Sequence, residues 1–354
     1  MDDQTTKAAI ISMAALVGAG IAYKGLSSSR ATTSSEPSQD LYHIGIETGG
    51  TTCKVGIMQG SKSLKMHSVK IIDTTSPAET ISKICEWLNN QEYTYSSLGV
   101  AAFGPLCLDK SSKDYGCVTS TPKVAWQYSP ILKFIMQGLL PHKKGKNFRV
   151  AFDTDCNILA KFELENGGHG DIKDNIAYIT VGTGIGVGFV INGKGIHGLI
   201  HPEGGHVCVP KHPLDVSKYN FEGTCTFHGG SCVEGLCTNT AIAKRLGLSS
   251  VADVPSLPDD HEIWEILGFY LGTMCSNLTL TLSVQKIVIG GGVMNRGEVL
   301  FKHIRKTFKD NLKGYLKHEK LDELDNYIVR SKFENELGLI SSAAVGATAE
   351  KWED

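Results

Sequence analysis

Four potential metal ligands are concentrated in the segment 201–235, a stretch rich in Gly and Pro. They are two imidazoles and two thiols: His206, Cys225, His228 and Cys232. This donor set is typical of tetrahedral zinc, and the last three ligands are close enough in sequence for one loop to hold the ion. The alternative is a long loop with free cysteines and surface histidines. Four eligible ligands in one irregular segment favour zinc.

Two carboxylates, Glu203 and Glu234, occur in the same segment, and no apolar periodicity surrounds them. Carboxylates accept hydrogen bonds from hydroxyl groups, so paired carboxylates suit a polyol ligand. A loop that is held by a metal ion and also carries carboxylates predicts a ligand-binding site, and not only a metal site that stabilises the fold.

Two glycine-rich turns each separate two apolar, β-branched stretches. The first turn contains Gly49, Gly50, Thr51 and Thr52, and the second contains Thr180, Gly182, Thr183 and Gly184. Each predicts a hairpin whose turn presents N–H groups and hydroxyls, as a phosphate requires. Neither has the Gly-Lys-Ser/Thr ending of a Walker sequence, and the second is no dinucleotide fingerprint. Each alone is more often an ordinary hairpin, but the weak repeat indicates two lobes that face each other across a nucleotide.

A third glycine cluster, Gly290 to Gly292, follows the apolar run Ile287–Ile289. This pattern predicts a buried parallel strand that ends where a ligand can approach the backbone.

Two carboxylates and an amide follow an apolar strand pattern at Asp153, Asp155 and Asn157. Enzymes of the α/β class place their reactive groups at the carboxyl ends of strands, so these residues are candidates for catalysis. The alternative role for Asp153 or Asp155 is capping the helix that follows, and we expect one of the two to do so.

The elements that must position these residues are readable from periodicity. We expect strands within 41–58, 64–71 and 97–103, an amphipathic helix over 78–91, a long buried helix over Glu262–Val284 and a closing helix of small residues over 338–349.

A chain of 354 residues with 41% hydrophobic content can build two lobes. The net charge of −2 offers no basic face, so nucleic acid is not an expected partner. Ten cysteines without a regular framework indicate a reducing compartment.

From about Leu41 to Val345 the chain resembles the ROK family of sugar kinases, and within it the fructokinases. Nine motifs carry the resemblance in order: Gly45–Thr51, Ala102–Leu106, Thr121–Lys123 with Trp126, Asp153–Asn157, Thr180–Gly186, His201–His206, His212–Asp215, Cys225–Glu234 and Gly290–Val293. A single motif of this kind is weak evidence for a family, whereas nine motifs in the same order along the chain are specific evidence.

The resemblance implies an α/β, two-lobed, actin-like ATPase fold (ribonuclease-H-like) with a zinc-stapled loop. The N-terminal lobe would span 41–150 and the C-terminal lobe 151–354, with the zinc loop at 201–235 and the last helix packing back on the N-terminal lobe. The implied cofactors are ATP, Mg²⁺ near Asp155 and Glu47, and Zn²⁺. The implied roles are Asp155 as base, sugar contacts from Asn157, Glu203, His206 and Glu234, phosphate contacts from both glycine turns, and an adenosine contact from Gly290, Gly291 and Gly292.

The activity implied is ATP-dependent phosphorylation of a hexose, with fructose converted to fructose 6-phosphate. The alternatives are a kinase for mannose, glucose or an N-acetylated amino sugar such as N-acetylmannosamine, and a non-catalytic sugar sensor. Homodimers are common in the family. The chain departs from the family at Thr52, where a lysine is usual, with Lys54 two places on, and at Gly204, where methionine is common.

The amino terminus has a different composition. After a tail of seven residues, residues 8–23 are uncharged and apolar or small, and 24–40 form a Ser/Thr-rich linker. We expect 8–23 to be a short membrane anchor, although a bilayer span usually needs about 20 residues. Asp2 and Asp3 disfavour a signal peptide, and a soluble chain with an apolar tail is the third alternative. The basic residues Lys24 and Arg30 follow the apolar segment, which predicts that the catalytic region stays on the cytosolic side of the membrane. Because the segment is short, it suits the mitochondrial outer surface or another thin membrane.

Overall fold

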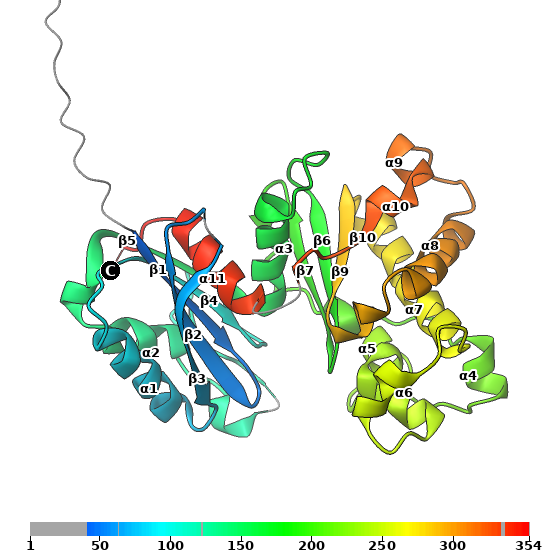
Figure 1. Ribbon diagram of the computed structural model, residues 1–354, viewed down its shortest axis with the longest axis horizontal. Coiled ribbons are helices and arrows are strands. Elements are labelled where there is room, and N and C mark those ends of the chain that lie inside the picture. Colours follow the sequence, from blue (N-terminus) through cyan, green and yellow to red (C-terminus); the bar gives the residue numbers. More distant parts are fainter. Residues whose placement is uncertain (1–40, 63, 122, 334–336, 354) are drawn as a thin grey trace, which may run out of the picture. The chain divides into compact units, whose positions relative to one another are not determined.

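The first half of the fold is built on a mixed five-stranded sheet with the strand order β3-β2-β1-β4-β5 (Figure 1). The computed structural model describes residues 41–353 except 63, 122 and 334–336. The strands are β1 (Tyr42–Thr48), β2 (Thr52–Gln59), β3 (Met66–Asp73), β4 (Tyr95–Ala102) and β5 (Lys144–Thr154). Strands β1, β2 and β3 are antiparallel neighbours, whereas β1, β4 and β5 run parallel. The two parallel pairs bring the carboxyl ends of β1, β4 and β5 to the same edge.

Helices cover both faces of this sheet. On one face α1 (Pro77–Asn89) and α2 (Ile131–Gly138) form a core with the buried side chains of β1, such as Ile44. On the other face lies α11 (Leu337–Thr348), which comes from the end of the chain. Its close approach depends on glycine, because a Cβ at Gly99 of β4 would lie 1.7 Å from the carbonyl oxygen of Ser342. The small residues expected over 338–349 therefore allow helix and sheet backbones to touch.

A second mixed sheet has the order β10-β9-β6-β7-β8. Its strands are β6 (Ile176–Val181), β7 (Ile185–Ile191), β8 (Lys194–Gly195), β9 (Lys286–Gly290) and β10 (Ile328–Arg330). Strands β6, β9 and β10 are parallel, and the β6/β7 and β7/β8 pairs are antiparallel. Helix α3 (Asp155–Asn166) packs on one face, and its Ile158 and Phe162 also contact α11.

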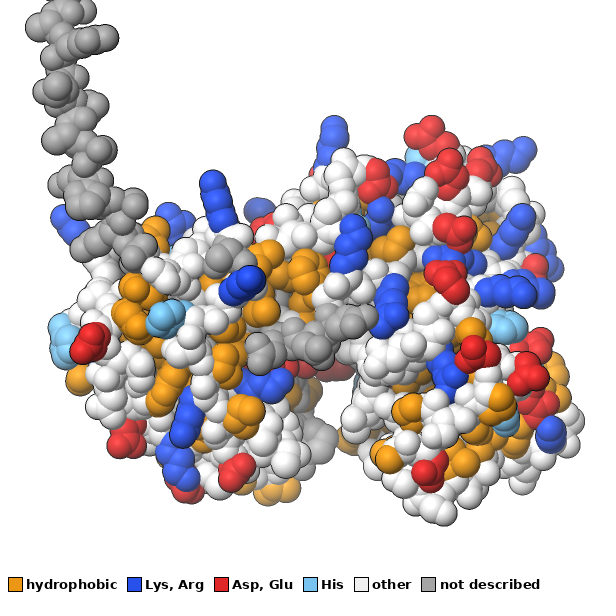
Figure 2. Space-filling view, in the orientation of Figure 1, with side chains coloured by type: hydrophobic (Ala, Val, Ile, Leu, Met, Phe, Trp, Pro, Cys, Tyr) orange, Lys and Arg blue, Asp and Glu red, His pale blue; other side chains and the backbone are white. Residues whose placement is uncertain are grey.

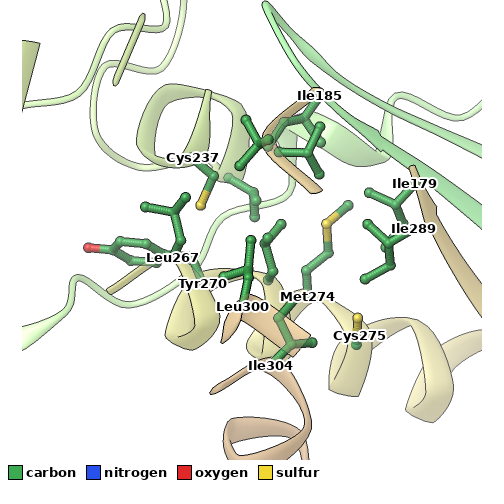
Figure 3. Packing of buried hydrophobic residues seen from close by; sticks show 14 of the residues in the cluster. Ile179, Ile185, Cys237, Leu267, Tyr270, Met274, Cys275, Ile289, Leu300 and Ile304 are labelled. Carbon is green, nitrogen blue, oxygen red and sulfur yellow. The ribbon is translucent and has the colours of Figure 1, made fainter. Parts of the chain in front are cut away.

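The opposite face of the second sheet carries the larger core. Helices α7 (Ile263–Leu282) and α8 (Glu298–Leu312) pack against it. Figure 3 shows Ile179 and Ile289 of the sheet directed toward Met274 of α7 and Leu300 of α8. All four side chains are fully buried. The shorter helices are α4 (Pro213–Ser217), α5 (Val233–Cys237), α6 (Asn239–Leu246), α9 (Glu319–Asp322) and α10 (Leu324–Tyr327).

Both strand–turn–strand predictions are confirmed, since β1/β2 and β6/β7 are antiparallel hairpins. The prediction of a buried parallel strand before Gly290 is also confirmed, because all five residues of β9 are buried and it pairs with β6 in parallel. The segment 201–235 differs from a plain loop, since it contains α4 and the beginning of α5. Helix α4 begins where the imidazole of His212 accepts a hydrogen bond from the N–H of Leu214, and Pro213 occupies the first turn.

The predicted tail, membrane anchor and linker all lie in residues 1–40, outside the described residues. Within the described part of the chain, no helix combines the length and the hydrophobicity that crossing a bilayer requires. Acidic and basic side chains are interspersed on the face shown in Figure 2, in keeping with the small net charge.

Candidate active site

A cleft of about 330 Å³ brings together residues that are far apart in the sequence. They come from the end of β4, the β5–α3 junction, the β6/β7 turn, the segment after His201, and α5. The lining includes seven residues predicted as site residues: Asp155, Thr180, Gly182, Thr183, Gly184, Glu203 and Glu234. A larger cavity of about 640 Å³ lies along β10 and contains none of the predicted residues, so the smaller cleft is the candidate active site.

Asp155 lines this cleft and is the first residue of α3. The expectation that Asp153 or Asp155 caps the helix is wrong, because the Thr154 hydroxyl takes that place and accepts the N–H of Asn157 at 3.1 Å. The Asp155 carboxylate accepts the N–H of Cys156 at 2.8 Å, and the Cys156 thiol is a second hydrogen-bond partner. The carboxylate also lines the cleft, so it can face a ligand.

Burial raises the pKa of Asp155 above the usual range of a carboxyl. Hydrogen bonds from the side chain and the backbone of Cys156 oppose this shift, and the nearby carboxylate of Glu47 adds to it. A carboxylate with a raised pKa is a stronger proton acceptor than an exposed one, as general-base catalysis requires.

Asp153 has a structural role beside the cleft. One carboxylate oxygen accepts the side-chain N–H of Asn157 at 2.9 Å, and the other lies 2.9 Å from Nε2 of His197. The amide oxygen of Asn157 accepts the N–H of Phe189 at 3.2 Å. Asn157, predicted to contact the sugar, is therefore buried and occupied by protein partners, and it does not line the cleft. The hydrogen bond to Asp153 raises the pKa of His197.

His201 is a cleft residue to which the sequence assigned no role. Its Nε2 accepts the N–H of Leu106 at 3.0 Å, so the ring proton resides on Nδ1, which lies 3.6 Å from Oε1 of Glu203. Burial lowers the pKa of His201 and raises that of Glu203. The partner Leu106 is 95 residues away, and no local signal in the sequence reveals this contact.

Glu234 is held in place by the β6/β7 turn. Its Oε2 accepts the N–H of Ile185 at 3.1 Å, and its Oε1 lies 3.8 Å from Nε2 of His206. A carboxylate from α5 is thereby fixed at the edge of the glycine turn that contains Gly184.

The four predicted metal ligands converge in the structure. One ligand atom from each of His206, Cys225, His228 and Cys232 lies within 4.8 Å of the others. The Cys225 sulfur is 3.8 Å from Nδ1 of His206 and 3.5 Å from Nδ1 of His228, and the Cys232 sulfur is 3.8 Å from Nδ1 of His206. Zinc bonds of about 2.0–2.3 Å give tetrahedron edges of about 3.3–3.8 Å. The donor set and spacing fit zinc, with Nε2 of His206 left free to face Glu234.

The other two glycine clusters lie outside the cleft. The turn with Gly49, Gly50, Thr51 and Thr52 does not line it, and Gly290, Gly291 and Gly292 border a separate small cavity with Arg330 and Ser331. At the first turn the ammonium group of Lys123 donates to the carbonyl oxygen of Gly50. Lys54, the lysine nearest to Thr52, instead pairs with Glu47 at 3.1 Å. The cation at this turn therefore comes from a distant motif.

A buried ion pair supports the carboxylate side of the cleft. Arg245 of α6 contacts Asp215 of α4 through two bonds of 2.7 and 2.9 Å, and both side chains are fully buried. The same guanidinium donates to the carbonyl oxygen of Leu236 at 2.9 Å, and the Tyr270 hydroxyl donates to Asp215 at 2.6 Å. The Arg245–Asp215 pair thus links α4, α6 and α7, and through Leu236, two residues beyond Glu234, it also holds α5.

Asp215→Asn should therefore lower the free energy of unfolding by about 3–5 kcal/mol, because it leaves a buried guanidinium without its counter-charge. The matched control is Glu222→Gln, which breaks the exposed 3.3 Å pair with Lys211 and should cost less than about 1 kcal/mol. Urea denaturation of both variants measures the difference. Equal losses would show that the buried pair has no special weight.

This chain is similar in sequence to a known protein family and to several of its members. Residues 43–348 match the model described as the ROK family. A fructokinase from Zymomonas mobilis subsp. mobilis is 35% identical over 309 residues, which cover 86% of this chain and 96% of the relative. A fructokinase from Lactococcus lactis subsp. cremoris is 36% identical over 276 residues, covering 78% of this chain and 87% of the relative.

Among solved structures, a ROK family glucokinase from Streptomyces griseus in complex with glucose and AMPPNP has a TM-score of 0.63 at 21% identity. The alignment covers 87% of this chain and 100% of the glucokinase chain. This likeness confirms the predicted α/β, two-lobed, actin-like fold.

Proposed function

This chain belongs to the ROK family, and on that premise we propose that it transfers the γ-phosphoryl group of ATP to fructose, giving fructose 6-phosphate. The observation that carries the proposal is Asp155, a half-buried carboxylate of raised pKa in a polar cleft, within a chain more than one-third identical to two fructokinases. The structural likeness to a glucokinase makes glucose the second candidate substrate.

Phosphoryl transfer requires positioning and charge neutralisation more than covalent chemistry from the protein. Asp155 would accept the proton of the attacking sugar hydroxyl as the bond to phosphorus forms, which its raised pKa favours. Its place at the first turn of α3 keeps the carboxylate fixed by the Cys156 N–H where it lines the cleft.

The sugar would lie among Glu203, Glu234 and the free face of His206. Both carboxylates line the cleft, where Glu234 is partly buried and Glu203 is more exposed. Carboxylates accept hydrogen bonds from vicinal hydroxyls. His201 would keep Glu203 oriented through Nδ1, while Leu106 holds the imidazole from the opposite side. At Gly204 an added Cβ would lie 2.9 Å from Val187, so this departure from the family lets the loop pack closely on β7.

The phosphates of ATP would bind at the two glycine turns, with adenosine near Gly290–Gly292. Lys123 would supply the positive charge at the first turn, where the chain has Thr52 in place of the usual lysine. Mg²⁺ arrives with ATP and neutralises charge on the phosphates, and Asp155 and Glu47 are the carboxylates suited to orient it.

Zinc bound by His206, Cys225, His228 and Cys232 would staple the segment that carries Glu203 and Glu234. If Nδ1 of His206 binds the metal, Nε2 remains 3.8 Å from Glu234. Carboxylates beside a ligating histidine commonly fix its orientation. The metal would therefore order the sugar site without taking part in the chemistry.

The test of function is a coupled ADP-release assay with fructose, glucose, mannose and N-acetylmannosamine, using the Asp155→Asn variant as the diagnostic. We expect fructose to give the highest kcat/KM and Asp155→Asn to lower kcat by at least about 100-fold while circular dichroism stays unchanged. Asp153→Asn, the matched control, should lose less because that carboxylate contacts protein groups.

The pH dependence gives a second measure of the same role. The base must be ionised, so kcat/KM should fall as the pH drops through a value above the ordinary carboxyl range. Glu47→Gln should move that limb to lower pH, since the Glu47 carboxylate raises the pKa of Asp155. ADP release with no sugar, or the reverse ranking of Asp153 and Asp155, would contradict the assignment.

For the metal, Cys225→Ser should sharply reduce bound zinc and lower the unfolding temperature, because a structural metal contributes folding free energy directly. Atomic absorption on the purified chain measures the zinc content. Cys208→Ser is the control, since Cys208 is exposed and outside the cluster. Full zinc occupancy in the Cys225 variant would refute the ligand set.

For the phosphate turn, Lys123→Ala should raise the KM for ATP or lower kcat by about 10-fold or more, because a charge-assisted contact to phosphate is lost. The control Lys113→Ala removes an exposed lysine from the same lobe and should leave both constants unchanged. A larger effect of Lys54→Ala on the KM for ATP would instead assign the cation to Lys54.

We further propose that residues 8–23 attach the chain to a membrane with the catalytic region in the cytosol, supported by the uncharged apolar composition of this segment. Carbonate extraction should leave the full chain in the membrane pellet, whereas a chain that starts at Ser35 should be released and active. Protease added to intact organelles should digest the catalytic region. Release of the full chain by carbonate would exclude the anchor.

A further inference from the structure

A second cysteine pair lies in a hairpin beside the cleft, outside the metal cluster. Leu106 and Val118 form an antiparallel bridge. The N–H of Cys107 donates to the carbonyl oxygen of Cys117 at 2.9 Å, and the N–H of Thr119 donates to that of Pro105 at 2.7 Å. Cys107 and Cys117 are therefore the next pair in register and share one hydrogen bond. The second bond is displaced, since the N–H of Cys117 donates to the carbonyl oxygen of Asp114 at 3.0 Å and the N–H of Gly116 donates to that of Cys107 at 3.0 Å.

Opposite residues of a hydrogen-bonded antiparallel pair have Cα atoms about 5.5 Å apart and side chains on the same face. Disulfides span Cα separations of about 4.4–6.8 Å. The register of the bridge and the shared hydrogen bond therefore bring the two Cα atoms near the range that a disulfide spans.

Both thiols are partly exposed, whereas Cys53, Cys85 and Cys156 are buried. The pKa of Cys117 is raised mainly by burial, and the Asp114 carboxylate and Cys107 add to this shift, as expected of neighbouring groups. The metal-ligand cluster found among the described residues includes neither. Cys107 and Cys117 are therefore both accessible to solvent and close to each other in the hairpin.

We propose that Cys107 and Cys117 form a reversible dithiol–disulfide site. One thiolate attacks a small-molecule disulfide, forms a mixed disulfide and releases one thiol. The second cysteine then attacks the protein sulfur of that bond, which closes the Cys107–Cys117 bond and releases the second thiol. Two protein thiols are oxidised and one external disulfide is reduced to two thiols, so electrons and protons balance.

The position of the pair connects it to the active site. The N–H of Leu106, next to Cys107, holds His201, and Gly104 lines the cleft. Beyond Cys117 the chain continues through Thr119 toward Lys123 at the first glycine turn. The disulfide would close the loop 107–117, which is connected to His201 through Leu106 at one end and leads toward Lys123 at the other. The antiparallel pairing of Leu106 and Val118 in the reduced chain would be retained.

The test uses the full-length reduced chain, incubated with glutathione disulfide at about pH 8 because the Cys117 thiol is harder to ionise than usual. Remaining thiols are alkylated and the protein is digested with trypsin. Lys110 and Lys113 are exposed between the two cysteines, so cleavage there separates Cys107 from Cys117. We expect one linked peptide pair, lighter by two hydrogen atoms than its separate members and split by dithiothreitol.

Two variants make the result decisive. Cys107→Ser and Cys117→Ser should each retain a glutathione adduct on the remaining thiol, whereas the parent chain loses it by ring closure. Cys208→Ser serves as the control, because Cys208 faces Cys232 across another antiparallel bridge and its loss should leave the linked peptides unchanged. A stable adduct on the parent chain, or linkage of Cys107 or Cys117 to other cysteines, would overturn the proposal. Neither readout requires kinase activity.

Discussion

The close approach of two helices to two sheets determines where the cleft residues lie. A Cβ at Gly188 of β7 would be 1.9 Å from the carbonyl oxygen of Cys156, and one at Gly99 of β4 would be 1.7 Å from that of Ser342. Backbone therefore meets backbone, which glycine alone permits. Because α3 lies this close to β7, its first residue, Asp155, is carried against the β6/β7 turn. A bulkier residue at Gly188 would push α3, and with it Asp155, away from β7, whereas one at Gly99 would push α11 away from β4.

The segment between His201 and α6 is held by polar contacts in addition to the apolar core that its Val209, Phe221 and Val233 join. Four potential zinc ligands converge at one end, and the buried Arg245–Asp215 pair ties four helices together at the other. Glu234 lies between these two supports and accepts the N–H of Ile185. A site for a hydroxyl-rich ligand needs fixed carboxylates, and irregular backbone holds them only if it is stapled in this way.

Charge in the cleft is arranged so that neighbouring groups differ in proton affinity. Burial raises the pKa of Asp155 and Glu203, while it lowers the pKa of His201. Asp153 is set apart by its bonds to Asn157 and His197. Two aspartates separated by one residue therefore serve different purposes, one facing the ligand and one holding the scaffold. The helix cap, which either could have supplied, is left to Thr154.

The sequence by itself determined the features that depend on local pattern. The two hairpins follow from alternating apolar residues around Gly/Thr turns, the helix of small residues from its composition, and the four potential zinc ligands from their spacing. Contacts across long separations were decided by the tertiary structure alone. Leu106 with His201, Lys123 with Gly50 and Asp153 with His197 join residues 95, 73 and 44 positions apart. Asn157 is held by the N–H of Phe189, 32 positions away, as well as by its neighbour Asp153, and it does not line the cleft. Periodicity and spacing report which face a residue occupies on its own element, whereas the partner it meets depends on how the sheets and helices pack.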